Sequence, residues 1–443
     1  MKTIKQWLRR LDNILASAGS RFLSNFTDFT PEDSPPHIRQ KLLIDCSYLY
    51  STHVNTGIQR VVRNIVRHID PCAEQNNLEL HTVALVNGGF IELDRDAVED
   101  FEKLPKWKSI ARRISRKLQL YTLSFFSREK IYRGDIVLLL DSSWYLPIWP
   151  SLEYAKKRGA HIVAVSYDLI PLSHPQFCDD RLQSVFAQWY EKSLHYVDGY
   201  LSISKSVMNE LEVYLKKNGV DVKRYGFDSF TLGADFKQKQ NSPQEVRKEL
   251  HTLFDTLRSP YLTVSTIEPR KNHRYIFESF KRLWERNIDA SWIIVGKKGW
   301  KTETLLDEIY THEMYGEKLF LFSDLDDNEL EYAYRHSKAL IFASIVEGYG
   351  LPIIESLANG LPVLASDTPV HREVGGTKID YFDISDPEAL ISLIAAIEKE
   401  DRTLIGVAPD NISVPDWEES ARELLEKTLI ITQKKRGESD HEA

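Results

Sequence analysis

The segment Glu347-Gly-Tyr-Gly-Leu-Pro-Ile-Ile-Glu355 is the stretch that decides the fold. It follows the apolar, strand-like run 339–342 and opens a helix that Asn359-Gly360 brings to an end. Its glycines, Gly348 and Gly350, let the backbone approach a ligand closely, and the free N–H groups of a helix start can hold a phosphate. A strand, a glycine turn and a helix form the unit of a doubly wound α/β domain.

The same alternation of strand and helix continues on both sides of this segment. Around it, strand-like runs occur at 261–265, 292–295, 319–322, 339–342 and 362–365. Helical patterns lie between them at 273–286, 327–336, 351–359 and 387–399. An earlier series has strand-like runs at 42–46, 82–86, 136–140, 162–165, 200–203 and 227–232, again with helical stretches between most of them. This order predicts parallel strands covered by helices on both faces.

A polar stretch at residues 237–243 separates the two series and predicts a domain boundary. The expected organisation is an N-terminal amphipathic helix and linker, two Rossmann-like domains, and a C-terminal helix with a tail. Their ranges are 1–36, 37–239, 240–415 and 416–443. Two doubly wound domains in tandem place the carboxyl ends of their strands, where ligands bind, at a common cleft.

Composition excludes several classes of protein. The chain has 443 residues, of which 42% are hydrophobic and 28% charged, and this balance is that of a folded rather than a disordered chain. A formal net charge of -8 argues against nucleic-acid binding. Three cysteines are too few for a disulfide framework and fit a cytoplasmic location. No apolar run reaches the roughly 18 residues that a membrane-spanning helix needs.

Two segments of the chain are basic and amphipathic. Residues 2–23 show helical spacing of apolar side chains, with lysines and arginines between them. Residues 103–133 contain ten Lys and Arg but a single acid, Glu129. Both segments could lie on an anionic membrane surface, close to a lipid-linked substrate. Packing of either helix on the protein is the alternative, and the favoured expectation is a protein peripheral to the inner face of the cytoplasmic membrane.

The two glutamates of the deciding segment are candidate binding residues. Glu347 precedes the turn and Glu355 lies just inside the helix, so both carboxylates can reach one ligand. Carboxylates accept hydrogen bonds from sugar hydroxyls, and a phosphate at the helix start between them suits a nucleotide sugar. For Glu355, stabilisation by the helix dipole is an alternative explanation.

These residues carry a resemblance to a known family. The two glutamates and the following Ser356-Leu-Ala-Asn-Gly-Leu-Pro-Val-Leu-Ala-Ser366 resemble the signature of retaining family 4 glycosyltransferases. Ser265-Thr-Ile-Glu-Pro-Arg-Lys-Asn272 resembles the phosphate-binding segment of the same family, in the same order and spacing. The resemblance implies a GT-B fold, in which two Rossmann-like domains face a central cleft and the C-terminal helix crosses back to the first domain.

The resemblance implies roles for four residues of the second domain. Glu347 matches the glutamate that contacts hydroxyls of the donor sugar, and Glu355 matches the one that binds the nucleotide ribose. Lys271, together with Arg270, matches the cations on the donor diphosphate. Two cations would stabilise the leaving nucleoside diphosphate as the glycosidic bond breaks. A solvated pair of loop residues is the alternative for Arg270 and Lys271.

Further positions of the second domain follow from the same resemblance. The remaining donor-binding residues that it implies are Gly348, Tyr349, Gly350, Leu351, Asp324 and Leu325. The last two fall where the base-contacting loop of the family lies. The chain also departs from the family, because Ser265 and Thr266 stand where many members carry a glycine and an arginine.

In the first domain, Thr56-Gly57-Ile-Gln-Arg60 resembles a bacterial subgroup of the family that makes surface polysaccharides. Gly57 would let the backbone approach the diphosphate, with Arg60 nearby; a helix N-cap with a surface arginine is the alternative.

A second motif of the first domain contains Tyr167, which occupies the place of a histidine found in many members of the family. Asp168 then becomes the candidate that orients or deprotonates the acceptor hydroxyl. Capping of the turn before Pro171 is the alternative for Asp168.

Two Asp-x-Asp patterns raise the question of a catalytic metal. They are Asp94-Arg-Asp96 and Asp324-Leu-Asp326, and a three-residue pattern is weak support for a metal site. The second begins a predicted helix, where the dipole favours acids. The expectation is therefore an enzyme with no metal and no cofactor, which takes a nucleotide sugar as its substrate.

The function expected from the sequence is transfer of a hexose, with mannose from GDP-mannose as the favoured donor. The transferase would be retaining and independent of metal, and its acceptor a saccharide or lipid-linked saccharide. The pathway expected is synthesis of a bacterial O-antigen, capsule or exopolysaccharide. Another GT-B enzyme, either an inverting transferase or a sugar epimerase, is one alternative. A non-catalytic subunit that binds nucleotide sugars is the other.

Overall fold

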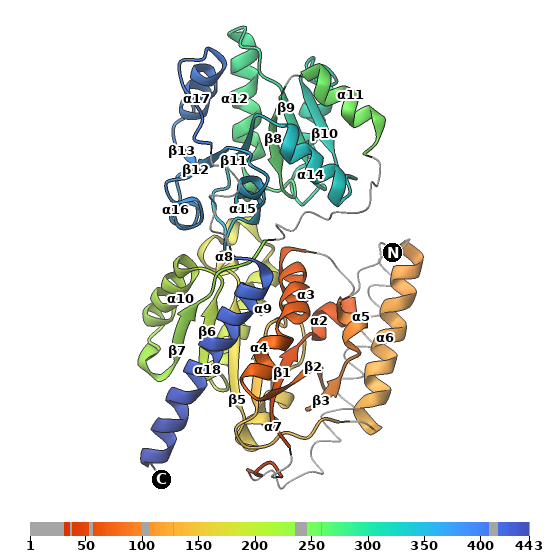
Figure 1. Cartoon of the computed structure of the whole chain (residues 1–443), viewed down its shortest axis with the longest axis vertical. Coiled ribbons are helices and arrows are strands. Elements are labelled where there is room, and N and C mark those ends of the chain that lie inside the picture. Colours follow the sequence, from red (N-terminus) through yellow and green to blue (C-terminus); the bar gives the residue numbers. More distant parts are fainter. Residues whose placement is uncertain are drawn as a thin grey trace. The chain divides into compact units, whose positions relative to one another are not determined.

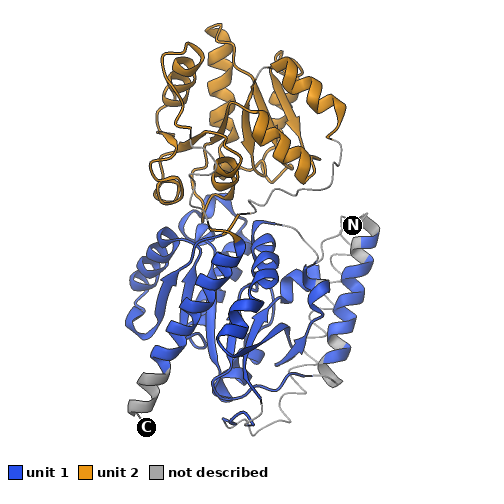
Figure 2. Cartoon of the chain, in the orientation of Figure 1, with its two compact units in different colours: residues 1–232, 417–443 blue, residues 233–416 orange. Residues whose placement is uncertain are grey.

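The computed structural model describes residues 31–35, 38–52, 56–99, 106–126, 128–234, 246–257, 259–406 and 415–442. These residues form two compact units (Figure 2). The N-terminal unit comprises residues 1–232 and 417–443, and the C-terminal unit comprises residues 233–416. Each unit is built around one sheet, and each is described by itself.

The sheet of the N-terminal unit has seven strands in the order β3-β2-β1-β4-β5-β6-β7 (Figure 1). All neighbouring pairs are parallel except β2 and β3, which form an antiparallel hairpin. The strands are β1 Gln40–Asp45, β2 Leu78–Val86, β3 Gly89–Glu92, β4 Ile136–Leu139, β5 His161–Ser166, β6 Gly199–Ser202 and β7 Gly226–Ser229. Leu43, at the centre of β1, lies opposite His81 of β2 and Val137 of β4.

Helices surround this sheet, and the last of them comes from the end of the chain. They are α2 Ser47–Thr52, α3 Gly57–His68, α4 Asp70–Gln75, α5 Arg95–Glu99, α6 Lys106–Phe126, α7 Trp149–Lys157, α8 Ile170–Ser173, α9 Asp180–Ser193, α10 Lys205–Lys217 and α18 Trp417–Glu442, with short 3-10 turns at Pro175–Phe177 and Val222–Arg224. The terminal helix α18 contacts α3, α4 and the strands β5, β6 and β7.

The sheet of the C-terminal unit has six strands, all parallel, in the order β10-β9-β8-β11-β12-β13. Its strands are β8 Tyr261–Val264, β9 Trp292–Val295, β10 Leu319–Phe322, β11 Ala339–Phe342, β12 Val363–Ser366 and β13 Asp380–Phe382. Its helices are α11 Lys248–Leu257, α12 His273–Glu285, α13 Glu303–Thr311, α14 Asp327–His336, α15 Leu351–Ala358, α16 Pro369–Gly375 and α17 Ala389–Glu398, with a 3-10 turn at Pro269–Lys271.

Both faces of the C-terminal sheet are buried, which explains the continuous apolar runs in its sequence. In β9, Trp292 and Ile294 belong to one hydrophobic cluster, whereas Ile293 and Val295 belong to another. Successive side chains of a strand point to opposite faces, so an uninterrupted apolar run places apolar side chains on both sides of the sheet. The predicted α/β class is confirmed, as is the return of the C-terminal helix to the first domain.

Some expectations fall partly or wholly outside the described residues. The amphipathic helix at 2–23 lies entirely outside them, and of the expected N-terminal helix and linker, residues 1–36, only residues 31–35 are described. Within the basic segment 103–133, residues 106–126 form the long helix α6. Within the residues that the structure describes, no helix combines the length and the apolar character needed to cross a membrane.

Candidate functional site

Arg270 and Lys271 lie in a tight turn at the carboxyl end of β8. The chain leaves β8 and forms the 3-10 turn Pro269–Lys271 before α12 begins at His273. Asn272 joins the turn to the helix with a φ of 59°, in the left-handed region that asparagine tolerates better than most residues. Both basic side chains therefore come from a three-residue turn beside β8, one of the two central strands of the sheet.

The loop after β11 meets this turn, because β11 is the hydrogen-bonded neighbour of β8. The backbone N–H of Ile345 donates to the carbonyl oxygen of Arg270 at 2.8 Å, which fixes the loop to the turn. Gly350 then caps α15 with a φ of 106°, and Pro352 occupies the first turn of that helix. The predicted arrangement of strand, glycine turn and helix is thus present, with the turn supported from the adjacent strand.

Glu347 joins the two basic side chains in one charged cluster. One of its carboxylate oxygens lies 2.8 Å from Arg270 Nη1, and the other accepts a hydrogen bond from Lys271 Nζ. The Nε atom of Arg270 also pairs with Glu268 at 2.7 Å. The side chain of Glu347 is only 8% exposed. The cluster is therefore a largely buried group of two cations and two carboxylates.

The electrostatics of this cluster favour the charged state of Glu347. Burial alone would raise the pKa of its carboxyl group, but the positive charges of Lys271 and Arg270 outweigh burial and hold the pKa well below its ordinary value. The Lys271 ammonium also lies 5.3 Å from the centre of the Phe342 ring, where a cation is attracted to the aromatic face. Two cations held this way form a preorganised site for an anion.

Glu355 lies on α15 and has a different partner. Its carboxylate accepts a hydrogen bond from the hydroxyl of Tyr334 at 2.9 Å. Tyr334 is a buried residue of the neighbouring helix α14. The sequence analysis missed Tyr334, since its place in the apolar pattern of α14 gives no sign that the hydroxyl reaches another helix. This hydrogen bond orients the Glu355 carboxylate, which therefore interacts with Tyr334 as well as with the helix dipole.

The remaining predicted residues of the loop differ in exposure. Gly348, Tyr349 and Gly350 are buried, and Leu351, the first residue of α15, is half-buried. The positive φ of Gly350 is a conformation that side chains disfavour, which explains the glycine there independently of any ligand. Binding roles for these four residues stay predictions.

Asp324 and Leu325 follow β10 and are engaged within the fold. Arg247 donates to the Asp324 carboxylate at 3.1 Å and also binds Glu329. Leu325 packs against the hydrophobic core of the unit. Asp326, the second acid of this Asp-x-Asp pattern, caps α14 by accepting from the backbone N–H groups of residues 328 and 329. The second Asp-x-Asp pattern is therefore explained in part by the start of α14, as the sequence analysis proposes.

The predicted residues of the N-terminal unit lie in two places, the first turn of α3 and the turn that follows β5. Gly57 begins α3, and a side-chain atom added there would meet nothing within 4 Å. Packing therefore does not require this glycine. Arg60, one turn further along, is half-buried. Approach of a diphosphate to the Gly57 backbone stays a prediction, compatible with the open space beside it.

Asp168 takes part in the turn that follows β5. Its carboxylate accepts a hydrogen bond from the backbone N–H of Ile170 at 3.0 Å. This is the turn-capping contact that the sequence analysis gives as the alternative to a catalytic role. Tyr167 is buried, and its hydroxyl donates to the carbonyl oxygen of Leu140 at 2.6 Å. Tyr167 therefore joins the ends of β4 and β5, and the catalytic role of Asp168 stays a prediction.

A buried pair of carboxyl groups escaped the sequence analysis. Asp45 ends β1, Asp141 follows β4, and both side chains are buried. Burial, with the nearby Asp141 charge, raises the pKa of Asp45 to about 7. Gln59 donates to Asp141 at 3.3 Å and to Ser142 at 2.8 Å, which connects the pair to the first turn of α3. Each Asp ends an apolar run, Leu-Leu-Ile-Asp45 or Leu-Leu-Leu-Asp141, and that repeated pattern is the signal that could have revealed the pair.

The structure therefore brings together three of the predicted residues, namely Arg270, Lys271 and Glu347. Glu355 lies about one turn along α15 and is bound to Tyr334 instead. Gly57, Arg60 and Asp168 belong to the N-terminal unit, which is described separately. The chemistry of the three grouped residues is that of anion binding beside a carboxylate able to accept hydrogen bonds from hydroxyl groups.

Comparison with known proteins identifies the class to which this site belongs. Residues 254–405 match the family model described as "Glycosyl transferases group 1", and this range includes every predicted site residue of the C-terminal unit. The match covers about a third of the chain and lies within the C-terminal unit, which is therefore similar to the glycosyl transferases of group 1. The two mostly parallel sheets agree with the GT-B fold that the sequence analysis expects.

Curated relatives and solved structures extend the comparison to most of the chain. A serotype-specific mannosyltransferase, WbdA of Escherichia coli, is 28% identical over 411 residues, which cover 88% of this chain and 47% of WbdA. The O-antigen chain mannosyltransferase RfbU of Salmonella typhimurium is 26% identical over 271 residues, covering 58% of this chain and 70% of RfbU. The chain thus spans about half the length of the WbdA proteins that it matches.

A structural relative supports the fold. The crystal structure of Anabaena HepE in complex with UDP-glucose superimposes with a TM-score of 0.53 at 13% identity. The superposition covers 90% of this chain and 99% of HepE. At this identity the likeness concerns the architecture alone, and it extends over both units of the chain.

Proposed function

We propose that the chain is a retaining glycosyltransferase that moves a hexose from a nucleoside diphosphate sugar without the help of a metal ion. The observation that carries the proposal is the buried cluster of Arg270, Lys271 and Glu347 at the carboxyl ends of β8 and β11. In open α/β sheets, ligands bind at this edge. The cluster offers two cations for a diphosphate and one carboxylate for sugar hydroxyls.

In the proposed reaction, the diphosphate of the donor takes over the two cations. Arg270 and Lys271 release Glu347 and bind phosphate oxygens, so the negative charge that develops on the leaving diphosphate is stabilised. Glu347 then accepts hydrogen bonds from hydroxyls of the donor sugar, and Glu355 binds the ribose. The acceptor proton passes to the leaving diphosphate, so the reaction needs no strong protein base. Asp168 orients the acceptor hydroxyl.

The names of the relatives support a mannosyl donor and a polysaccharide acceptor. Both relatives described above are mannosyltransferases, and RfbU is named for the O-antigen chain. We therefore propose GDP-mannose as donor and a saccharide or lipid-linked saccharide as acceptor, in synthesis of O-antigen, capsule or exopolysaccharide. The basic helix α6 would hold the enzyme on the inner face of the cytoplasmic membrane.

Donor binding and hydrolysis with GDP-, UDP-, dTDP- and ADP-sugars, measured in EDTA, test this proposal. We expect GDP-mannose to bind and to be slowly hydrolysed in EDTA, and the Glu347→Ala variant to lose that turnover. The matched control is Glu331→Gln, a substitution of a surface glutamate that pairs with Arg335 on α14. It should leave hydrolysis unchanged.

Three results would contradict the proposal in different ways. Failure of every nucleotide sugar to bind would remove the assignment of the cluster as a donor site. A requirement for a divalent metal would remove the metal-free mechanism. Inversion of the anomeric configuration, read by nuclear magnetic resonance of the first product formed on an acceptor, would remove the retaining mechanism while leaving glycosyl transfer in place.

A further inference from the structure

A second group of ligating side chains lies in the N-terminal unit, on the edge of the sheet formed by β2 and β3. His81 and Glu79 are alternate residues of β2 and so share one face of the sheet. Glu92 of β3 lies opposite Val83, the next residue on that same face. The segment after α6 covers this face, and the backbone N–H of Glu129 donates to Phe90 of β3 at 2.8 Å.

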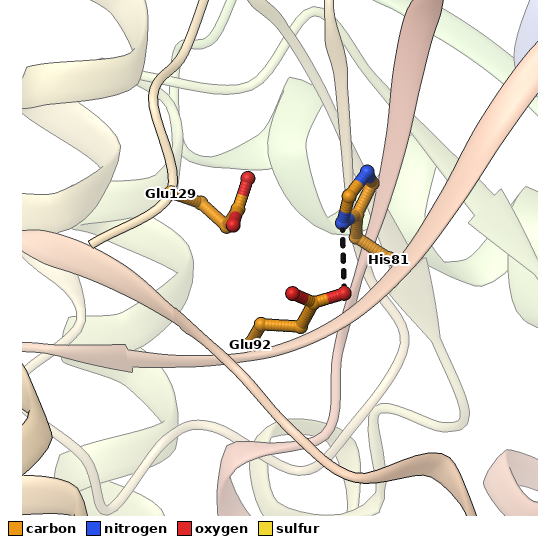
Figure 3. A group of neighbouring side chains, drawn as sticks. All are labelled: His81, Glu92 and Glu129. Carbon is orange, nitrogen blue, oxygen red and sulfur yellow. Dashed lines mark hydrogen bonds and ion pairs between the residues drawn. The ribbon is translucent and has the colours of Figure 1, made fainter. Parts of the chain in front are cut away.

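Three side chains of this group face one another, as Figure 3 shows. One ligand atom each from His81, Glu92 and Glu129 lies within 4.8 Å of the other two. The Nδ1 atom of His81 is 3.1 Å from Glu92 Oε1. His81 is 8% exposed, so its ring is held in a fixed position by the sheet and by the covering segment. The three atoms come from separate parts of the chain, and an ion among them would join those parts.

The second nitrogen of the His81 ring has the surroundings expected for a metal ligand. Its Nε2 atom lies 3.4 Å from Glu79 Oε1. A histidine that binds a metal through one nitrogen commonly presents the other to a carboxylate, which fixes the ring and increases its basicity. Glu79 is placed for that role, and Nδ1 of His81 is left to bind the ion.

The charges of the group match a divalent cation. The carboxylates of Glu79, Glu92 and Glu129 contribute three negative charges, and Lys41 contributes one positive charge at 2.7 Å from Glu129 Oε2. With a neutral imidazole the group carries two excess negative charges. Lys41 contacts only one oxygen of Glu129, so the other oxygen can bind an ion, although the ammonium charge opposes it.

We propose that His81, Glu92 and Glu129 bind a divalent transition-metal ion, for which Zn²⁺ is the best match. One imidazole nitrogen with carboxylate oxygens suits Zn²⁺, whereas Mg²⁺ and Ca²⁺ prefer sites made of oxygen atoms alone. The group lies toward the amino ends of β1 and β2, and ligands of doubly wound sheets bind at the carboxyl ends. The ion therefore stabilises the β2–β3 edge and takes no part in glycosyl transfer.

Calorimetric titration of the chelator-treated, full-length protein with ZnCl₂ tests the site directly. We expect one Zn²⁺ per chain, weaker binding of Mg²⁺, and a higher thermal midpoint with Zn²⁺ than without it. His81→Gln should weaken Zn²⁺ binding at least about tenfold, because even replacement of a residue that only orients a metal ligand costs about that much. His195→Gln, which changes an exposed histidine outside the group, should bind Zn²⁺ like the unchanged protein.

Two further variants keep the test decisive if His81→Gln fails to fold. Glu92 has a 56% exposed side chain, so Glu92→Gln should fold normally and bind Zn²⁺ more weakly. Lys41→Gln should bind Zn²⁺ more tightly, because it removes the ammonium from Glu129. Lys130→Gln removes an exposed charge nearby and is its control.

The proposal is overturned if Zn²⁺ binds with equal affinity to the unchanged protein and to Glu92→Gln, or if Lys41→Gln and Lys130→Gln behave alike. Either result would reduce the group to ion pairs, with any bound Zn²⁺ adventitious only. Glycosyl transfer is not part of the readout. The metal site and the proposed function can therefore fail independently, provided that hydrolysis in EDTA is measured below the thermal midpoint of the chelator-treated protein.

Discussion

Glu347 is a single residue with two opposing effects on the same site. Its carboxylate neutralises Arg270 and Lys271, which stabilises the buried cluster, and it thereby competes with any diphosphate for those cations. A buried charge that loses its partner is costly, so the cations need either Glu347 or another anion. The residue is expected to oppose nucleotide binding and to support transfer.

Replacement of Glu347 by glutamine separates these effects. Glu347→Gln should bind GDP at least as tightly as the unchanged protein and gain more thermal stability from it, because GDP then replaces the Glu347 carboxylate as the anion in direct contact with Lys271. Turnover should fall by roughly 100-fold or more, the scale seen when one preorganised interaction with the reacting group is lost. Calorimetry with GDP and initial rates with GDP-mannose measure the two effects. Parallel loss of both would show instead that the substitution disrupts the fold of the site.

The Asp45–Asp141 pair makes stability depend on pH. Because the pKa of Asp45 is raised to about 7, the folded state retains a proton that the unfolded state has already released. The free energy of unfolding therefore falls as pH rises from the ordinary pKa of aspartate toward 7, and changes no further above that.

Asp45→Asn should remove this dependence. Its amide oxygen can still accept from the Ser47 backbone, and no charge remains to be buried. We expect the variant to be roughly 1–3 kcal/mol more stable than the unchanged protein at pH 8, since one pKa unit is worth about 1.4 kcal/mol, with a smaller gain at pH 5. Urea unfolding at both pH values measures this. Asp401→Asn, at an exposed position, is the control; equal effects of the two substitutions would exclude the pair as the cause.

The residues of the candidate site were predictable only where a local motif contains them. Arg270, Lys271 and Glu347 stand in short segments beside strand ends, so sequence and strand order together bring them close. Tyr334 and Arg247 act on the site from other elements, through contacts that no local spacing reveals. The burial of Asp45 and Asp141 likewise depends on β1 and β4 being neighbours, although each Asp visibly ends an apolar run.

At the scale of elements, the start of α15 shows how backbone geometry supports the site. Gly350 caps the helix with a φ of 106°, and an added side-chain atom would contact Ile353 at 3.4 Å and Phe342 at 3.5 Å. These are ordinary van der Waals contacts. Strain in the left-handed region is therefore the larger cost of replacing this glycine.

Gly350→Ala should cost roughly 1–2 kcal/mol of stability through that strain and should weaken donor binding by moving the loop that contains Glu347. Gly406→Ala is the control, because an added atom there meets nothing within 4 Å and its φ is not positive. Thermal unfolding and nucleotide titration of both variants provide the comparison. A Gly350→Ala protein with unchanged affinity would show that the loop does not depend on this cap.

Element boundaries were predictable where capping and periodicity agree. The helix α10 spans Lys205–Lys217, because Ser204 caps its start and lysines occupy its last turn. The strand β3 was missed, although the Asn87-Gly88 turn before it is a strong hairpin signal and both residues have positive φ. A strand predicted at 227–232 ends at Ser229, since apolar residues continue beyond the end of its pairing with β6.

At the scale of the molecule, chain order and spatial order differ. The last helix, α18, belongs to the N-terminal unit, so the C-terminal unit is inserted between two parts of the same compact body (Figure 2). The helix approaches β6 and β7 closely: a side-chain atom added at Gly199 or Gly226 would lie 2.8 Å from Ile431. The sequence predicts the helix from its periodicity, but only the family resemblance indicated where it docks.

Two consecutive isoleucines of α18 test this docking. Ile431 is 3% exposed against the sheet, whereas Ile430 is 46% exposed on the other side of the helix. Ile431→Ala should destabilise the N-terminal unit by roughly 2–5 kcal/mol, the range for removing a buried isoleucine side chain, and Ile430→Ala should cost far less. Hydrogen exchange followed by mass spectrometry resolves the two units. Peptides from β6 and β7 should exchange faster in Ile431→Ala, while those from β8 and β11 stay unchanged. Equal protection in the two variants would mean that the N-terminal unit is complete without α18.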